Sequence, residues 1–173
     1  MLAARLLSLR QHGRVPGPEL ILRICDDGRR YGLRHFFYGG EANVAEQLAG
    51  NLSQLYPGLD VVGCYSPPMR PLDFEEDNDV VTRINNANPD ILWVGLGAPK
   101  QEKWMMRHLG RIHANALIGV GAAFDFHSGN KPWCPPWLRW AGLEWAYRLA
   151  CEPRRMWRRN LDSLLFLGLI VAQ

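Results

Sequence analysis

Two short segments combine glycines with polar side chains in a spacing suited to binding a phosphate-bearing ligand. The first is the pair Gly39 and Gly40, which follows the apolar run 35–38. The second is the segment 95–102, which follows the apolar run 90–94 and contains Gly95 and Gly97. Glycine lets a backbone approach a ligand closely, and the start of a following helix offers free N–H groups and a positive dipole end. Both segments are therefore candidate phosphate-binding turns.

The second segment has the richer set of side chains. Pro99 can open a helix, because the N–H it lacks is unused at the first helical position. Lys100, Gln101 and Glu102 then lie at the start of that helix. A cation, an amide and a carboxylate together can hold a diphosphate and a sugar hydroxyl. Neither segment has the dinucleotide-binding or Walker spacing, so plain strand-to-helix turns and a solvated first helical turn stay open as alternatives.

Alternating strand and helix patterns surround these turns. Continuous apolar runs fit strands covered on both faces, as in a parallel sheet, and they occur at residues 35–38, 59–62, 90–94 and 116–120. Helical spacing of apolar residues occurs at 41–52, 78–86 and 101–109. The order predicts a Rossmann-like α/β fold with a mainly parallel sheet and flanking helices. Ligands bind at the carboxyl edge of such sheets, where both glycine turns would lie.

The chain changes character after residue 137. We predict an α/β domain over 1–137 and a basic, amphipathic appendage over 138–173, with two helical pieces that meet near Pro153. Its largely apolar tail, 161–172, is shorter than the ~20 residues that span a bilayer. Arginines followed by this tail predict reversible attachment to an anionic membrane surface, with a helix packed on its own sheet as the alternative. Trp133, Trp137 and Trp140 either stack on a sugar, lie among headgroups or pack in a core.

Composition excludes several classes of protein. The 173 residues are 47% hydrophobic and 21% charged, as in a soluble globular domain. The given sequence does not open with a secretory leader, so we expect a cytoplasmic location and reduced thiols. The four cysteines are widely spaced without a C-x-x-C pair, and we expect them to be buried structural thiols. Five scattered histidines lack the spacing of a metal site, so we predict no structural metal and no cofactor, and a Mg²⁺ held loosely on a nucleotide stays open. The basic cluster near the C-terminus is short and followed by apolar residues, which argues against nucleic-acid binding; it consists of Arg148, Arg154, Arg155, Arg158 and Arg159.

Several segments resemble one protein family. Residues 90–104, DILWVGLGAPKQEKW, resemble the P-K-Q-E segment of the WecG/TagA/CpsF glycosyltransferases, glycosyltransferase family 26. Residues 118–126, IGVGAAFDF, resemble that family's second glycine strand, and 142–149 and 152–155 resemble its C-terminal signature. Residues 14–17 and 36–40 also match in the expected order. These ordered matches cover nearly the whole chain, which is thereby identified as similar to this family.

The resemblance implies an activity and its substrates. Members transfer N-acetylmannosamine, its uronic acid or glucose from a UDP-sugar to a polyprenyl-diphosphate-linked acceptor, with inversion at the anomeric centre. They act in teichoic acid, enterobacterial common antigen or exopolysaccharide synthesis. The expected location is peripheral, on the inner face of the bacterial plasma membrane, and exposed apolar surface makes a homo-oligomer an expectation. By motif position, Arg14 would neutralise the leaving diphosphate and Gln101 would contact the bound substrates, both as catalytic residues.

A departing diphosphate needs cations, and arginine presents a permanently charged fork that matches phosphate oxygens. Pairing of Arg148 with Glu144 or Glu152 stays open as the structural alternative. The full set of predicted substrate-binding residues is Gly39, Gly40, Gly95, Gly97, Pro99, Lys100, Glu102, Asp125, Glu144, Arg148, Arg154 and Arg155.

Two departures from the family pattern leave an alternative function. The family carries an Asp-Gly element that supplies the proposed general base, and residues 1–7 resemble the helix that directly follows it. We therefore expect either a glycosyltransferase or a catalytically impaired remnant that binds a nucleotide sugar. Asp125 is a candidate substitute base, with a strand-end cap as the alternative. Trp133 and Cys134 replace the family's Arg-Ala before Pro135, which weakens a diphosphate contact by this loop.

Overall fold

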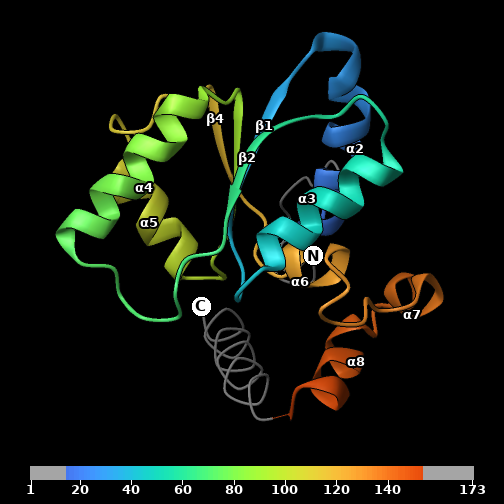
Figure 1. Ribbon diagram of the computed structural model, residues 1–173. Helices are drawn as coiled ribbons and strands as arrows, with labels where there is room; N and C mark the ends of the chain where they lie inside the picture. The colour runs from blue at the N-terminus through green and yellow to red at the C-terminus, as the bar shows by residue number, and fades with distance from the viewer. Residues whose placement is uncertain (1–14, 154–173) are drawn as a thin grey trace, which may run out of the picture. The chain divides into compact units, whose positions relative to one another are not determined.

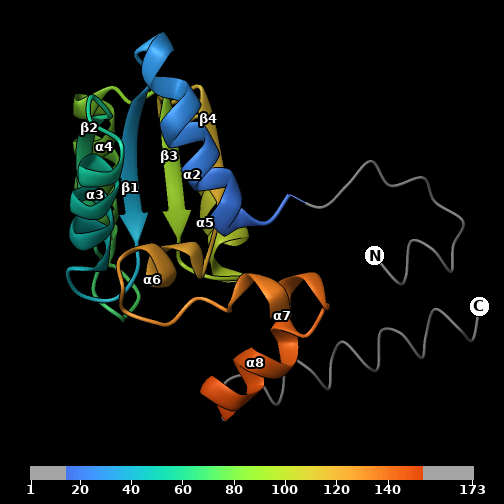
Figure 2. The same ribbon diagram turned by 90° about the vertical axis from the view of Figure 1, so that its right-hand side faces the viewer.

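Four parallel strands form the sheet (Figure 1), and Figure 2 shows them side by side in the order β2-β1-β3-β4. They are β1 (Arg34–Gly39), β2 (Asp60–Tyr65), β3 (Ile91–Gly95) and β4 (Ala116–Gly119). The computed structural model describes residues 15–153, so Arg14, Arg154, Arg155 and the apolar tail lie outside the described residues. The predicted strands and the Rossmann-like parallel sheet are confirmed. β2 runs three residues past its predicted end, because Gly63 leaves room for the Phe36 ring.

Helices cover both faces of the sheet (Figure 1). One face carries α2 (Gly17–Gly28), α3 (Val44–Leu55) and α6 (Ala123–His127), and the other carries α4 (Phe74–Ala87) and α5 (Lys100–His108). A short 3₁₀ helix, η1 (Arg29–Tyr31), precedes β1.

Successive strand residues alternate between the two faces. Phe37 and Trp93 pack with α2, α3 and α6, whereas Tyr38 and Val94 pack with α4 and α5. Both sets are buried. This period of two, inside continuous apolar runs, is what a sheet covered on both sides requires.

Two helix starts differ from the predicted positions for local reasons. α4 begins at Phe74 instead of residue 78, because Asp73 and Glu76 form a capping box. Asp73 Oδ1 accepts from the Glu76 N–H at 2.8 Å, and Glu76 Oε2 accepts from the Asp73 N–H at 3.0 Å. α3 begins at Val44 instead of residue 41, because Asn43 has a φ of 64°, outside the helical region.

His35, the second residue of β1, is a buried histidine. Trp93 Nε1 donates to His35 Nδ1 at 3.0 Å, so the neutral ring carries its proton on Nε2, which is buried without a hydrogen-bond partner within residues 15–153. Burial lowers the pKa of His35 below its ordinary value, against weaker raising effects of Asp60 and Asp90.

We predict that acid destabilises the fold partly through His35. The pKa of His35 is lower in the folded protein than in the unfolded chain, so the unfolded chain binds the proton first as pH falls. The contribution of neutral His35 to folding stability is therefore complete above about pH 6.5, the unfolded pKa, and is lost as pH falls below that value. The free energy of unfolding should drop by up to about 1.4 kcal/mol per pH unit for this group. Urea unfolding at about pH 7 and pH 5 should show a smaller drop for His35→Gln, whose amide can still accept from Trp93. An equal drop in both proteins would refute the assignment.

The contacts divide the chain into two units, of which Val15–Pro132 is one and residues 133–153 belong to the other. The second contains α7 (Pro136–Trp140) and α8 (Glu144–Cys151). These helices are separated at Gly142, which has a φ of 75°, a break that we did not predict. α8 ends before Pro153, as expected of a helix that precedes a proline. No helix among residues 15–153 is long and apolar enough to cross a bilayer.

Two predictions about burial are corrected. Trp137 and Trp140 are 65% and 87% exposed, so the core-packing alternative is wrong for both. Cys25 and Cys134 are buried and Cys64 is half-buried, but Cys151 is exposed. All four cysteines have free thiols. Burial raises the pKa of the Cys25 thiol to about 12, which makes it an inert structural thiol.

Candidate functional site

The candidate site lies where β1 and β3 end. The chain leaves β1 towards α3 on one face of the sheet and leaves β3 towards α5 on the other face. Neighbouring strands whose connections run to opposite faces create a crevice at the carboxyl edge, and this is where open α/β sheets bind ligands. β1 ends at Gly39 and β3 ends at Gly95, so both predicted glycine turns meet here.

Two of the glycines are required by the close approach of the two strands. The Gly40 N–H donates to the Gly95 carbonyl at 3.1 Å. Gly39 has a φ of 131°, and a Cβ on it would lie 2.6 Å from the carbonyl carbon of Gly95. A Cβ on Gly95 would overlap the Phe124 ring. The structural alternative therefore accounts for Gly39 and Gly95, whereas the position of a Cβ on Gly97 is open space.

The side-chain amide of Gln101 is buried beside these turns. The residue is 7% exposed, and its backbone N–H donates to the Gly97 carbonyl at 2.9 Å. Its Nε2 donates to Glu102 Oε1 at 3.0 Å and lies over Gly119, where a Cβ would be 2.8 Å away. Its Oε1 lies beside Gly121, where a Cβ would be 3.4 Å from the oxygen.

The Gln101 Oε1 atom has no hydrogen-bond partner in the described part of the chain, although it is buried. A buried acceptor without a partner costs about 1–3 kcal/mol of folding free energy. The Nε2 assignment follows from Glu102, whose carboxylate can only accept. An acceptor held at this cost, at the switch point of the sheet, favours a ligand that donates a hydrogen bond to it.

The other residues of the P-K-Q-E segment are the sequence neighbours of Gln101. Pro99 follows a cis peptide bond and is the N-cap of α5, one residue before the predicted position. Lys100 and Glu102 are exposed in the first turn of that helix. The segment therefore presents a cation and a carboxylate next to the buried amide of Gln101, as the sequence predicts.

We predicted that Asp125 lies at a strand end, and this is wrong: Asp125 lies inside α6. Gly121 and Ala122 turn the chain after β4, so the helix begins at Ala123. Asp125 Oδ1 accepts from Asn130 Nδ2 at 3.1 Å, and Oδ2 pairs with Lys131 Nζ at 3.2 Å. A buried carboxylate with these partners is typical of a structural role.

Arg148, one of the predicted arginines, does not belong to the unit that forms this edge. Arg148 pairs with Glu144 one turn earlier on α8, which is the structural alternative named above. Both belong to the second unit. Arg14, Arg154 and Arg155 lie outside the described residues.

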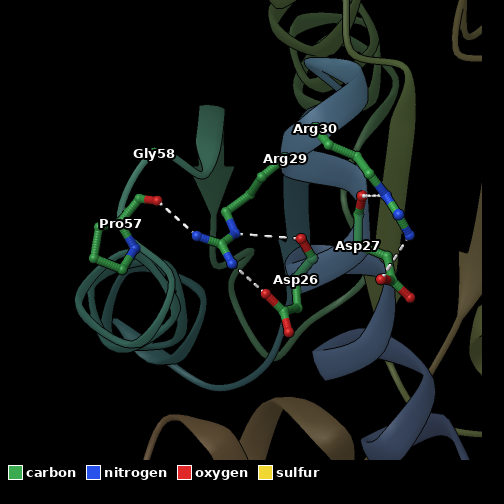
Figure 3. Close-up of a pocket in the computed structure, with 6 residues that line it drawn as sticks. All are labelled: Asp26, Asp27, Arg29, Arg30, Pro57 and Gly58. Carbon is green, nitrogen blue, oxygen red and sulfur yellow. Dashed lines mark hydrogen bonds and ion pairs between the residues drawn. The ribbon is translucent and has the colours of Figure 1, made fainter.

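A pocket also exists at the opposite, amino-terminal edge of the sheet (Figure 3). Arg29 donates to the Pro57 carbonyl at 2.9 Å and pairs with Asp26, and Arg30 pairs with Asp27 at 2.9 Å. None of the predicted site residues lines this pocket. Its charges are exposed and neutralise one another, so it does not favour a phosphate.

Sequence reasoning missed three residues at the carboxyl edge. Gly119 and Gly121 lie against the Gln101 amide, and their spacing after β4 repeats that of Gly95 and Gly97 after β3, a signal that was available. Ser66 Oγ accepts from the Ala45 N–H at 2.9 Å and thus caps α3. Residues 15–153 contain no group of three side chains that could ligate a metal.

The fold and this edge define a doubly wound α/β protein with glycine turns at its switch point. The chain belongs to the glycosyl transferase WecG/TagA/CpsF family, whose family model matches residues 1–173.

Two relatives of the chain carry the name N-acetylglucosaminyldiphosphoundecaprenol N-acetyl-beta-D-mannosaminyltransferase. The Bacillus subtilis (strain 168) protein is 32% identical over 163 residues, 94% of this chain and 61% of the relative. The Staphylococcus aureus (strain NCTC 8325 / PS 47) protein is 31% identical over 145 residues, 84% of this chain and 55% of the relative. The chain therefore spans less than two thirds of these relatives' length.

Proposed function

We propose that this chain forms the nucleotide-sugar-binding part of an inverting glycosyltransferase that acts on a polyprenyl-diphosphate-linked acceptor. The donor is a UDP-sugar, and the relatives' name favours N-acetylmannosamine over its uronic acid or glucose. The observation that carries the proposal is the buried, unpartnered Gln101 oxygen beside Gly97 and Gly121. A sugar hydroxyl or acetamido N–H is the donor that this acceptor needs.

Transfer requires two kinds of assistance. The acceptor hydroxyl oxygen attacks the anomeric carbon, the bond from that carbon to the diphosphate breaks, and the bonding electrons leave with UDP. Cations stabilise this charge. Lys100, at the start of α5, and Arg14, by motif position, are the proposed cations. The hydroxyl proton passes to a general base, which the family resemblance assigns to an Asp-Gly element N-terminal to the segments matched here.

The alternative is a remnant that binds a nucleotide sugar without turnover. Calorimetric titration with UDP, alongside a transfer assay with UDP-N-acetylmannosamine and a lipid-diphosphate-linked N-acetylglucosamine, separates the two. Turnover supports the transferase, and binding without turnover supports the remnant. Absence of both would refute the proposed function.

Peripheral attachment to an anionic membrane surface is part of the proposal. Trp140 and Trp145 are 87% and 56% exposed in the second unit, and the Arg139 guanidinium lies 4.0 Å from the centroid of the Trp133 ring. Aromatic and arginine side chains together are typical of the membrane–water interface.

We predict that anionic vesicles carry the protein in a flotation assay and that Trp140→Ser weakens this binding roughly three- to tenfold, because a large apolar side chain no longer enters the interface. Tyr31→Ser is the matched control, since Tyr31 is 71% exposed on the other unit and should not matter. Retention by DNA in a gel shift, without binding to vesicles, would contradict the membrane proposal.

A further inference from the structure

His108, the last residue of α5, is buried between two acceptors. It is 2% exposed. Its Nδ1 lies 2.8 Å from the Trp104 carbonyl oxygen, and its Nε2 lies 3.0 and 3.1 Å from the two carboxylate oxygens of Asp77. A carbonyl oxygen and a carboxylate can only accept, so both ring nitrogens carry a proton when these bonds are made. An imidazolium ion would therefore satisfy both acceptors at once.

The partner carboxylate links α5 to α4. Asp77 lies in the first turn of α4, and Arg111, just beyond α5, places Nη1 3.0 Å from Asp77 Oδ2. Arg111 Nη2 also donates to Asn78 Oδ1 at 2.8 Å. Two cationic donors thus surround one carboxylate. Both nitrogens of His108 are engaged, which leaves neither for a substrate or a metal and excludes a role as a catalytic base.

The same face of α5 leads to the candidate site. The buried residues of this helix are Gln101, Trp104 and His108, which share one stripe. The Trp104 ring stacks on His108 at 4.1 Å between centroids and on Tyr38 at 4.5 Å. Tyr38 directly precedes Gly39 at the end of β1. These contacts connect His108 to Gln101 along α5 and, through the Trp104 and Tyr38 rings, to the glycine turn.

We propose that His108 and Asp77 form a positioning pair, in which the proton on His108 holds α5 against α4 and thereby keeps the Gln101 amide over Gly119. Loss of that proton leaves one N–H for two acceptors, so either the Trp104 carbonyl or the Asp77 carboxylate loses its donor. The charged and titratable groups that face the ring are Asp77 from α4, Arg111 beyond α5 and Tyr38 from β1, the last through Trp104. We call this His108–Asp77 positioning pair the clamp. The clamp itself is inferred from geometry alone, whereas its consequence for ligand binding rests on the proposed function.

Nitrogen NMR of protein labelled at its histidine rings tests the clamp over about pH 6 to 9, with the His108 signals assigned by their absence in His108→Gln. Asp77→Asn is the informative variant, because its amide can donate to a bare Nε2 and so satisfies a neutral histidine. Asp27→Asn is the control, since Asp27 forms an exposed ion pair at the other edge of the sheet.

We expect two protonated nitrogens on His108 in the wild-type protein at the acidic end of this range, and one in Asp77→Asn. The backbone amide signals of Gln101 and Gly119 should move with the deprotonation of His108 in the wild type and in Asp27→Asn, but not in Asp77→Asn. The proposal would be overturned if one ring nitrogen of His108 carried no proton in the wild type at about pH 6. It would also be overturned if the amide signals of Gln101 and Gly119 did not change as His108 loses its proton.

Binding of UDP-N-acetylmannosamine connects the clamp to the proposed function. Affinity should fall roughly tenfold as His108 loses its proton, which is the expected effect of losing one charge-assisted hydrogen bond. Affinity of Asp77→Asn should be flat over the same range. If the affinity of the wild type and of Asp77→Asn depended equally on pH, the clamp would have no effect on ligand binding at the site. If neither binds the donor, the proposed function fails, and the NMR result alone decides the clamp.

Discussion

Replacing Gly39 by alanine should lower the free energy of unfolding by about 3 kcal/mol or more. The backbone there has a φ of 131°, and the new Cβ would lie 2.6 Å from the carbonyl carbon of Gly95. Backbone atoms cannot give way as a flexible side chain can, so β1 and β3 would have to separate at their carboxyl ends. Urea unfolding measures the loss, and ligand affinity should fall with it because the switch point opens.

Gly50 supplies the matched control for this substitution. It lies inside α3, its backbone is helical, and a Cβ on it would meet no atom within 4 Å. Gly50→Ala should therefore stabilise the protein by about 0.5–1 kcal/mol, the usual gain in a helix interior. Similar changes in the two variants would show that the approach of Gly39 to Gly95 is not under the constraint described here.

Gln101→Met should weaken binding of a UDP-sugar roughly tenfold without lowering stability. Methionine has a similar length but no acceptor, so the variant loses the bond to the ligand and also loses the cost of a buried, unpartnered oxygen. Residues that a fold keeps at a cost to stability are typical of functional sites. Calorimetric titration and thermal unfolding of the same preparations measure both effects.

Gln47→Met is the control for the glutamine substitution, because Gln47 is exposed on α3. It should change neither affinity nor stability. Wild-type affinity in Gln101→Met would remove Gln101 from the site. A clear loss of stability would instead identify Gln101 as a packing residue.

The sequence predicted the sheet because its strands are continuous apolar runs, which only a doubly covered sheet requires. The first residues of the helices were harder to predict. The start of α4 could have been predicted, because Asp73 and Glu76 have the spacing of a capping box. The α3 start depends on the left-handed conformation of Asn43, which apolar periodicity does not reveal.

The candidate site was predictable only where its residues are neighbours in sequence. The P-K-Q-E segment placed Gln101 at the start of α5, and the i, i+4 spacing of Glu144 and Arg148 was visible as an alternative. Burial of the Gln101 oxygen and the contact of Gly119 with its amide arise from β4, far along the chain, so no local pattern shows them. The same holds for Asp77 and His108, which are 31 residues apart.

Backbone amide NMR of the chain titrated with UDP tests the central claim most directly, because it locates the ligand without assuming turnover. We predict that the largest shifts occur at Gly40, Gly97, Gln101 and Gly121, at the carboxyl edge of the sheet. Residues of the opposite pocket, such as Arg29 and Gly58, should stay unchanged. Shifts that cluster at that pocket, with none around Gln101, would contradict the placement of the ligand at the switch point.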